Sequence, residues 1–381
     1  MNTERTVHIL GAGFAGLQAA RAVLHKDRSA GVTIVSAVPY ATMLPALPDI
    51  LTRRVPPGAI IRDLKEIFSR YGERVSVVVA EITEIDLEQR TLRDTLHTEY
   101  PWQTLIIATG STPEYYGFSQ TKNLQQLDTM ENAEALRQEF HHRDGTAVLV
   151  VGGGYTGLEV AAGLRVGEEK HPPITVVDVA DHILPFLPER RRQAILRYLD
   201  AMDITVRSGV ALQEYDGTTA ILSDGSKIEN VLVCWAAGMR GTRTEIRGTV
   251  GKTRDHRLHV ASDLTLPGYP QVFVAGDAAA LERDGQVLRR AVNFAFYSGR
   301  HAGRNVVRLW RGRARKPFRP VDLGWVIPLG RKSLGTVFGV LPVGGRLGLR
   351  LHYLMCGFRH FGVTQTLQFY WTALRLRRRV D

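Results

Sequence analysis

The stretch "LVVGGGYTGLEVAAGLR" (residues 149–165) is an apolar run that breaks into glycines and continues with the pattern of a helix. The stretch "HILGAGFAGLQAARAV" (residues 8–23) has the same order. In the spacing GxGxxG the first glycine makes a tight turn, the second lets a pyrophosphate approach the backbone, and the third lets helix and strand pack closely. One such motif is weak evidence, but two in a strand–turn–helix context predict two dinucleotide sites, with phosphates facing the positive helix ends. The glycines concerned are Gly11, Gly13 and Gly16 in the first loop, and Gly152, Gly154 and Gly157 in the second.

Each loop belongs to a predicted βαβ unit. Strands at residues 7–10 and 32–36 flank the first helix, and strands at residues 147–151 and 174–178 flank the second. A further strand ends in "VAGDAA" (residues 274–279). The predicted fold class is therefore α/β, with two Rossmann-like dinucleotide-binding domains.

The residue that ends the second strand of each unit indicates which nucleotide that unit binds. Asp178 can accept hydrogen bonds from a ribose hydroxyl and would repel a 2′-phosphate, which favours NADH over NADPH. The corresponding residue of the first unit is Ser36, which is uncharged. A hydroxyl still contacts a ribose, but we expect the nucleotide of the first loop to be held less tightly than usual.

Composition limits the class of protein. Of the 381 residues, 44% are hydrophobic and 23% are charged, which is typical of a globular chain. The two cysteines, Cys234 and Cys356, have no metal-binding or disulfide-framework spacing, so we expect no metal site, packing roles for both, and a reducing, cytoplasmic setting. The opening residues do not resemble an export signal, and no apolar run reaches the roughly 18 residues expected of a membrane-spanning helix.

The positive charge is concentrated near the end of the sequence. The formal net charge is +11, and residues 301–381 contain 16 Lys and Arg but only two Asp and Glu. Such a region attracts an anionic partner. Composition does not decide whether that partner is a lipid headgroup, a nucleic acid or an acidic protein.

The ordered set "ILGAGFAGLQAA", "IIATGS", "VVGGGYTGLEVAAGL", "WAAG" and "VFVAGDAA" resembles the two-dinucleotide-binding-domain flavoproteins over residues 5–310. The resemblance implies that the first loop holds FAD and that Gly276 and Asp277 reach its ribityl and phosphate part. An aspartate there accepts from ribityl hydroxyls, although a helix N-cap is an alternative role. Two such sites suggest electron transfer from NADH to FAD and onward. The FAD-binding residues implied are Gly11, Gly13, Ala15, Gly16, Ser36, Pro45, Ile82, Thr109, Gly110, Gly276 and Asp277, and the NADH-binding residues are Gly152, Gly154, Thr156, Gly157, Glu159, Asp178 and Gly238.

Within this superfamily the chain resembles the type II NADH:quinone oxidoreductases. It lacks the redox cysteine pair of the disulfide reductases and of the sulfide:quinone oxidoreductases. Its "GGGYTGLE" matches the family's GGGPTGVE with Tyr155 in place of proline, and "YATMLPAL" matches the flavin-lining stretch through Pro45. Glu159 matches the family's glutamate near the nicotinamide and is the predicted catalytic residue, although an acid on the first helical turn could instead complement the helix dipole.

The family's quinone motif AQxAxQxG is only partly kept. The sequence here is "AVNFAFYSG", with Asn293 and Tyr297 in place of the two glutamines and with Ala295 and Gly299 retained. The resemblance implies a quinone site that includes Asn293, Ala295 and Tyr297. An asparagine can still donate from its amide to a quinone carbonyl, but its side chain is shorter than that of the family's glutamine.

The predicted domains are an FAD-binding domain at 1–110 and 260–315, an inserted NADH-binding domain at 111–259, and a basic amphipathic C-terminal region at 316–381. The stretches at 345–362 and 367–379 mix arginines with aromatic and aliphatic residues, which suits an anionic membrane surface, although helices that cover the core would show the same pattern. We therefore expect a peripheral enzyme on the inner face of the cell membrane, with FAD and NADH as cofactors and a quinone as acceptor, and a homodimer stays open. The alternatives are a soluble NADH-dependent reductase of an acidic ferredoxin or rubredoxin, and a redox-sensing or nucleic-acid-binding flavoprotein, for which no nucleic-acid module is recognised.

Overall fold

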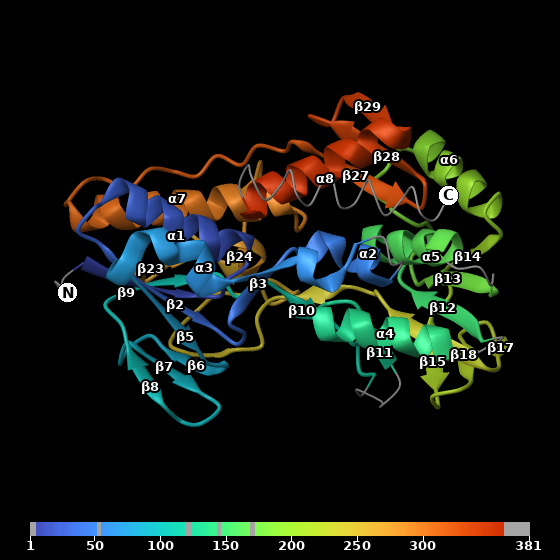
Figure 1. Cartoon of the computed structure of the whole chain (residues 1–381), viewed down its shortest axis with the longest axis horizontal. Helices are drawn as coiled ribbons and strands as arrows, with labels where there is room; N and C mark the ends of the chain where they lie inside the picture. The colour runs from blue at the N-terminus through green and yellow to red at the C-terminus, as the bar shows by residue number, and fades with distance from the viewer. Residues whose placement is uncertain (1–4, 52–54, 119–123, 143–145, 168–171, 362–381) are drawn as a thin grey trace. The chain divides into compact units, whose positions relative to one another are not determined.

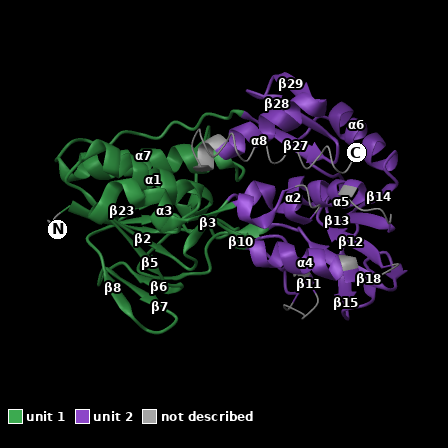
Figure 2. Cartoon of the chain, viewed as in Figure 1, with its two compact units in different colours: residues 1–42, 61–112, 239–323 green, residues 43–60, 113–238, 324–381 purple. Residues whose placement is uncertain are grey.

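The computed structural model describes residues 5–51, 55–118, 124–142, 146–167 and 172–361. The chain forms two compact units, each assembled from three segments (Figure 2). Unit 1 comprises residues 1–42, 61–112 and 239–323, and unit 2 comprises residues 43–60, 113–238 and 324–381.

Unit 1 is built on a six-stranded sheet in the order β22-β23-β9-β1-β2-β5, in which only β22 and β23 run antiparallel. The apolar run of β1 lies between β2 and β9, and every residue of β9 is buried, as expected for a parallel sheet covered on both faces. The strands are β1 (Thr6–Leu10), β2 (Gly31–Ser36), β5 (Val75–Val79), β9 (Thr104–Ile107), β22 (Thr265–Leu266) and β23 (Tyr269–Val274).

Helices α1 (Phe14–Lys26) and α7 (Val292–Trp310) lie side by side over this sheet (Figure 1). Two glycines of α7 allow their close approach. A Cβ on Gly299 would lie 2.1 Å from the Ala15 carbonyl oxygen, and a Cβ on Gly303 would lie 2.4 Å from that of Ala19. The helix following the phosphate loop is thus fixed by a helix 280 residues further along the chain.

A second sheet of unit 1 has the order β20-β6-β7-β8. Its strands are β6 (Ile82–Asp86), β7 (Thr91–Asp94), β8 (Glu99–Pro101) and β20 (Glu245–Arg247). The smaller elements are β3 (Tyr40–Thr42), β4 (Ile61–Asp63), α3 (Leu64–Phe68), β21 (Leu258–His259), β24 (Ala279–Ala280), β25 (Glu282–Arg283) and β26 (Gln286–Val287).

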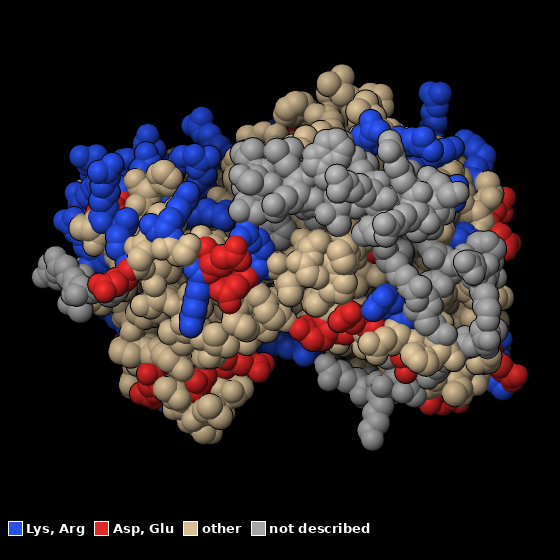
Figure 3. Space-filling model, viewed as in Figure 1, with Lys and Arg blue, Asp and Glu red and all other residues tan. Residues whose placement is uncertain are grey.

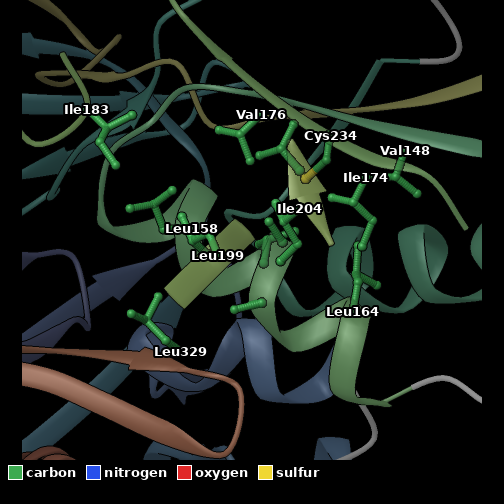
Figure 4. Close-up of a cluster of buried hydrophobic side chains, with 14 of the residues drawn as sticks. Val148, Leu158, Leu164, Ile174, Val176, Ile183, Leu199, Ile204, Cys234 and Leu329 are labelled. Carbon is green, nitrogen blue, oxygen red and sulfur yellow. The ribbon is translucent and has the colours of Figure 1, made fainter. Parts of the chain in front are cut away.

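Unit 2 contains a five-stranded, all-parallel sheet in the order β11-β18-β12-β13-β14. Its strands are β11 (Leu124–Gln126), β12 (Ala147–Val151), β13 (Ile174–Asp178), β14 (Ile204–Ser208) and β18 (Val231–Trp235), and its helices are α4 (Met130–His142), α5 (Tyr155–Gly167) and α6 (Glu189–Asp200). An antiparallel sheet of β15 (Leu212–Tyr215), β16 (Ala220–Leu222) and β17 (Lys227–Ile228) accompanies it. Cys234 lies in the core with Val176 and Leu158 (Figure 4), and burial raises the pKa of its thiol to about 12, so Cys234 packs as an apolar residue.

The C-terminal part of the described chain belongs to unit 2. It forms an antiparallel sheet of β27 (Gly324–Leu329), β28 (Lys332–Val337) and β29 (Leu341–Gly344), followed by α8 (Gly345–Phe361). Strand β27 packs against α5, and its Ile327 and Leu329 join the core beside that helix. Tyr353 of α8 donates to Asp49 of α2 (Leu47–Leu51) at 2.6 Å. The predicted amphipathic stretch at 367–379 lies outside the described residues.

Besides a shift of one boundary from residue 110 to residue 112, the units differ from the predicted domains at three places. Residues 239–259, predicted to belong to the NADH domain, lie in unit 1, where β20 pairs in parallel with β6. Residues 43–60 lie in unit 2 because α2 packs against α4 and α5. The predicted C-terminal region, 316–381, is divided at residue 324: Lys316 and Arg319 belong to unit 1, whereas Arg331, Lys332, Arg346 and Arg350 belong to unit 2.

Candidate dinucleotide-binding sites

The first glycines of the two loops occupy the same backbone conformation. Gly11 has φ +104° and Gly152 has φ +118°, values that L side chains rarely adopt. A Cβ on either residue would lie 2.3 Å from a carbonyl oxygen, that of Ala108 or that of Ala236. Both turns therefore require glycine.

The third glycines also correspond. A Cβ on Gly16 would lie 1.9 Å from the Gly11 carbonyl oxygen, and a Cβ on Gly157 would lie 1.9 Å from the Gly152 carbonyl oxygen. Each helix therefore packs onto its loop in the way that the GxGxxG spacing predicts.

The second glycines differ from the others because they face open space. Apart from the adjacent residues of the chain and the backbone of the following helix, no heavy atom of the described residues would lie within 4 Å of a Cβ on Gly13 or on Gly154. Gly13 is the N-cap of α1, and no described side chain caps that helix, so its first N–H groups are available to an anion. The Oγ1 of Thr109, a predicted FAD residue, is buried with no hydrogen-bond partner among the described residues. These observations fit the phosphate-bearing part of a dinucleotide at both loops, and unit 1 fits FAD.

Asp178 ends β13 beside the second loop. Its Oδ2 accepts from the Gly153 N–H at 2.6 Å, and its Oδ1 accepts from the Ala180 N–H at 2.8 Å. Each carboxylate oxygen retains a further acceptor position. Asp178 therefore fixes the shape of the loop and still offers acceptors to a ribose.

Asp277 lies in a 3₁₀ helix, Gly276–Ala278, directly after β23. The Gly276 N–H donates to the Ser298 Oγ of α7 at 2.9 Å, and φ +70° at Gly276 suits glycine. Burial raises the pKa of Asp277, while the charges of Arg290 and Arg257 and a hydrogen bond from Ser111 oppose that rise. The neighbourhood of two arginines was not predicted from the sequence.

The remaining residues implied for FAD are distributed between the units. Ser36 is buried at the end of β2, Ile82 begins β6, and Thr109 and Gly110 follow β9, all in unit 1. Ala15 is also in unit 1, where its Cβ would lie 2.8 Å from a Cβ on Gly276. Pro45 lies in a 3₁₀ helix, Leu44–Ala46, of unit 2.

The residues implied for NADH lie together in unit 2. Thr156 is exposed at the start of α5, and Gly238, with φ +141°, follows β18. Glu159 is partly buried as the fifth residue of α5, whose first turn holds no acidic residue. The alternative in which Glu159 complements the helix dipole from the first turn is therefore wrong, because that effect falls off within one turn.

Tyr155, which replaces the family's proline, makes contacts that the sequence did not reveal. Its ring centroid lies 5.2 Å from that of Phe186 and 5.9 Å from that of Trp325 in β27. This aromatic cluster joins the C-terminal hairpin to the start of α5. The exchange of proline for tyrosine was the only available signal.

The residues implied for quinone lie on α7 in different surroundings. Asn293 is buried, and its Nδ2 donates to the Val321 carbonyl oxygen at 2.9 Å. Ala295 is buried beside Gly276, whereas Tyr297 is 36% exposed. One N–H of the Asn293 amide is thus already used by the chain.

Within the described residues, no three or more His, Cys, Asp or Glu side chains group in a way that could hold a metal ion. None of the described helices is long and apolar enough to cross a membrane.

Residues 5–299 match the family model described as pyridine nucleotide-disulphide oxidoreductase, and the chain belongs to that family. Among curated relatives, it is 26% identical to the type II NADH:quinone oxidoreductase of Staphylococcus haemolyticus, over 88% of this chain and 90% of that protein. It is 27% identical to the type II NADH:quinone oxidoreductase Ndh of Mycobacterium tuberculosis, over 98% of this chain and 89% of that protein. The fold matches NDH2 from Plasmodium falciparum, solved in complex with NADH, with a TM-score of 0.85, 14% identity and 98% coverage of both chains. The resemblance predicted from the sequence is thus confirmed.

Proposed function

We propose that this chain is an FAD-dependent oxidoreductase that accepts a hydride from NADH and passes two electrons to a quinone. The proposal rests on the two phosphate loops, which have the same backbone geometry and each leave open space at the second glycine. The chain that contains them is similar to type II NADH:quinone oxidoreductases over most of its length. Bound FAD supplies the redox chemistry. The protein contributes binding, orientation and electrostatics.

The two units divide the binding work. In unit 1, the α1 N-terminus and Gly13 receive the FAD pyrophosphate, and Asp277 accepts from ribityl hydroxyls. In unit 2, Gly154 and the start of α5 receive the NADH pyrophosphate, and Asp178 accepts from the ribose while its charge disfavours a 2′-phosphate. Holding the two nucleotides in alignment contributes to the rate, because the hydride transfer then takes place within one complex.

The experiment that tests the function is anaerobic. The FAD-loaded protein is reduced with one equivalent of NADH, a short-chain quinone is added, and the flavin absorbance is followed. Rapid return of the absorbance supports quinone as acceptor and makes Asn293 the next residue to change. If NADH bleaches the flavin but the quinone does not restore its absorbance, the protein oxidises NADH and the proposed transfer to quinone is contradicted. Failure of NADH to bleach the flavin contradicts both.

Replacing Glu159 by glutamine is expected to slow flavin reduction by NADH about 100-fold, while FAD binding stays unchanged. The glutamate positions the nicotinamide or assists protonation, and a positioned acid or base contributes on this order. The rate is measured under single-turnover conditions by stopped-flow bleaching at saturating NADH. A Glu159→Asp variant, which keeps the carboxylate, serves as the control and should recover part of the rate. An unchanged rate in Glu159→Gln would remove the residue from the mechanism.

A basic face of unit 1 favours a second candidate acceptor. Lys and Arg side chains gather over α1 and α7 (Figure 3). Arg300 and Arg304 of α7 are both exposed. An acidic electron-transfer protein would fit this face. Its reduction would then fall steeply with salt, whereas reduction of an uncharged short-chain quinone would not.

The C-terminal part of unit 2 supports contact with a membrane surface. Leu347 and Leu354 of α8 are 70% and 42% exposed, and Val340 in the preceding turn is 73% exposed. The exposed Arg350 lies on the same face of α8 as the two leucines, because residues three and four apart share a face. Apolar side chains next to cations suit the headgroup region of an anionic leaflet. We therefore propose a peripheral location on the inner face of the cell membrane.

Replacing Leu347 and Leu354 together by glutamine is expected to weaken binding to phosphatidylglycerol vesicles at least tenfold. Full insertion of one leucine contributes on the order of 1.5–3 kcal/mol, so even partial insertion of the pair exceeds the roughly 1.4 kcal/mol that corresponds to a factor of ten. Co-sedimentation measures the bound fraction, with phosphatidylcholine vesicles as the uncharged comparison. The matched control is Leu96→Gln in unit 1, where the leucine is 82% exposed. Equal binding of the double variant and the control variant would contradict the proposed contact.

A further inference from the structure

An ion cluster in unit 1 surrounds Asp255. The carboxylate lies 2.9 Å from Arg257 Nε and 3.0 Å from Arg290 Nη1. Burial raises the pKa of Asp255, but hydrogen bonds from Thr253 and Arg257 and the charges of both arginines outweigh it and lower the pKa to about 2. Asp255 is therefore ionised and holds one edge of the Arg290 guanidinium.

The other edge of Arg290 meets no acceptor within the part of the chain that the structure describes. Its Nε and Nη2 are buried, and neither has a hydrogen-bond partner among the described residues. These two N–H groups point in parallel and form the fork with which arginine binds two neighbouring acceptor atoms. A charged donor that is buried without an acceptor costs the protein the full free energy of its desolvation. The fork is therefore expected to bind a ligand that supplies two acceptors.

The position of Arg290 indicates which ligand. Helix α7, which begins just after Arg290, packs against the 3₁₀ helix that contains Asp277, and the charges of Arg290 and Asp277 shift the pKa of each other. Asp277 is the residue proposed to reach the ribityl chain of FAD, and Arg290 lies two residues before the start of α7. The neighbouring Arg289 differs, since its two terminal nitrogens donate to Asp322 at 2.7 and 3.0 Å.

We propose that the Nε–Nη2 fork of Arg290 donates to the N1 and C2-carbonyl edge of the FAD ring system, which offers two adjacent acceptors and carries the negative charge of the reduced flavin. Arg290 would then stabilise reduced over oxidised flavin and raise the reduction potential of the bound cofactor. The inference rests on the proposed binding of FAD by unit 1. It does not depend on which acceptor takes the electrons.

The test is the equilibrium reduction potential of the flavin in FAD-loaded protein, measured against reference dyes without NADH or quinone. Arg290→Gln is expected to weaken the preference for reduced flavin tenfold or more, which is about 30 mV for a two-electron couple. Arg289→Gln removes the same charge one residue away and should leave the potential unchanged. Equal potentials in Arg290→Gln and the parent protein overturn the proposal, as does an equal loss in both variants.

If Arg290→Gln binds too little FAD for its potential to be measured, Arg290→Lys provides a second test. Arg290→Lys keeps the charge but loses the fork, and the reduction potential of its flavin should lie between those of the parent protein and Arg290→Gln. Titration with sulfite gives an independent readout, because sulfite adds to oxidised flavin to form an adduct with negative charge at the same edge. Sulfite should bind Arg290→Lys several-fold more weakly than the parent protein, and equal binding overturns the proposal.

A lower FAD affinity with unchanged potential and unchanged sulfite binding would place the fork on the pyrophosphate and would also overturn the proposal. Failure of the quinone experiment leaves the potentials measurable. Failure of this test leaves flavin reduction by NADH intact, so the two proposals fail separately.

Discussion

Replacing Gly13 by valine is expected to give a folded but colourless protein. Gly13 has φ −76° and ψ −169°, an extended conformation that β-branched residues adopt readily. Beyond the adjacent residues of the chain, no described atom lies within 4 Å of the added Cβ, so the apoprotein loses little stability. The side chain instead fills the space that the FAD pyrophosphate needs, and NADH oxidation should fall about 100-fold or more because the flavin is displaced or misplaced.

The ratio of flavin to protein absorbance after purification measures this loss, and thermal unfolding of the apoprotein tests the fold. Gly16→Ala is the informative contrast, since its Cβ would lie 1.9 Å from the Gly11 carbonyl oxygen. That variant should lose stability as well as flavin. A Gly13→Val protein that purifies with a full complement of FAD would show that the open space at Gly13 is not the phosphate site.

The local features of the sites were predictable from the sequence because they depend on local backbone geometry. A glycine at Gly11 or Gly152 is required by φ within one turn, and the strand before it is a continuous apolar run. Asp178 was predicted from its place at the end of a strand. The structure adds that the same carboxylate accepts from the Gly153 N–H, which no spacing rule contains.

The features that were missed depend on contacts between distant segments. Strand β20 has three residues and pairs with β6 from more than 150 positions earlier, so residues 239–259 carry no periodic signal of the unit they join. The pairing of Asp255 with Arg290 is of the same kind, because each residue alone resembles an ordinary surface charge. Helix bounds also mattered. The start of α5 at Tyr155 places Glu159 beyond the first turn and removes one of its two possible roles.

Replacing Gly154 by valine is expected to produce the opposite phenotype, a yellow protein that NADH no longer reduces. Gly154 faces open space as Gly13 does, so the added side chain should leave unit 2 folded and unit 1 loaded with FAD. It blocks the approach of the NADH pyrophosphate to the start of α5, and kcat/KM for NADH should fall about 100-fold or more. Dithionite, which needs no nucleotide site, should still bleach the flavin fully.

Each variant is the control for the other, because both add the same side chain at corresponding positions of two loops with the same geometry. If Gly154→Val loses FAD and keeps its response to NADH, the assignment of the two loops must be exchanged. If each variant loses only its expected nucleotide, the repeated loop is explained by two cofactors that are bound at the same time and used in sequence.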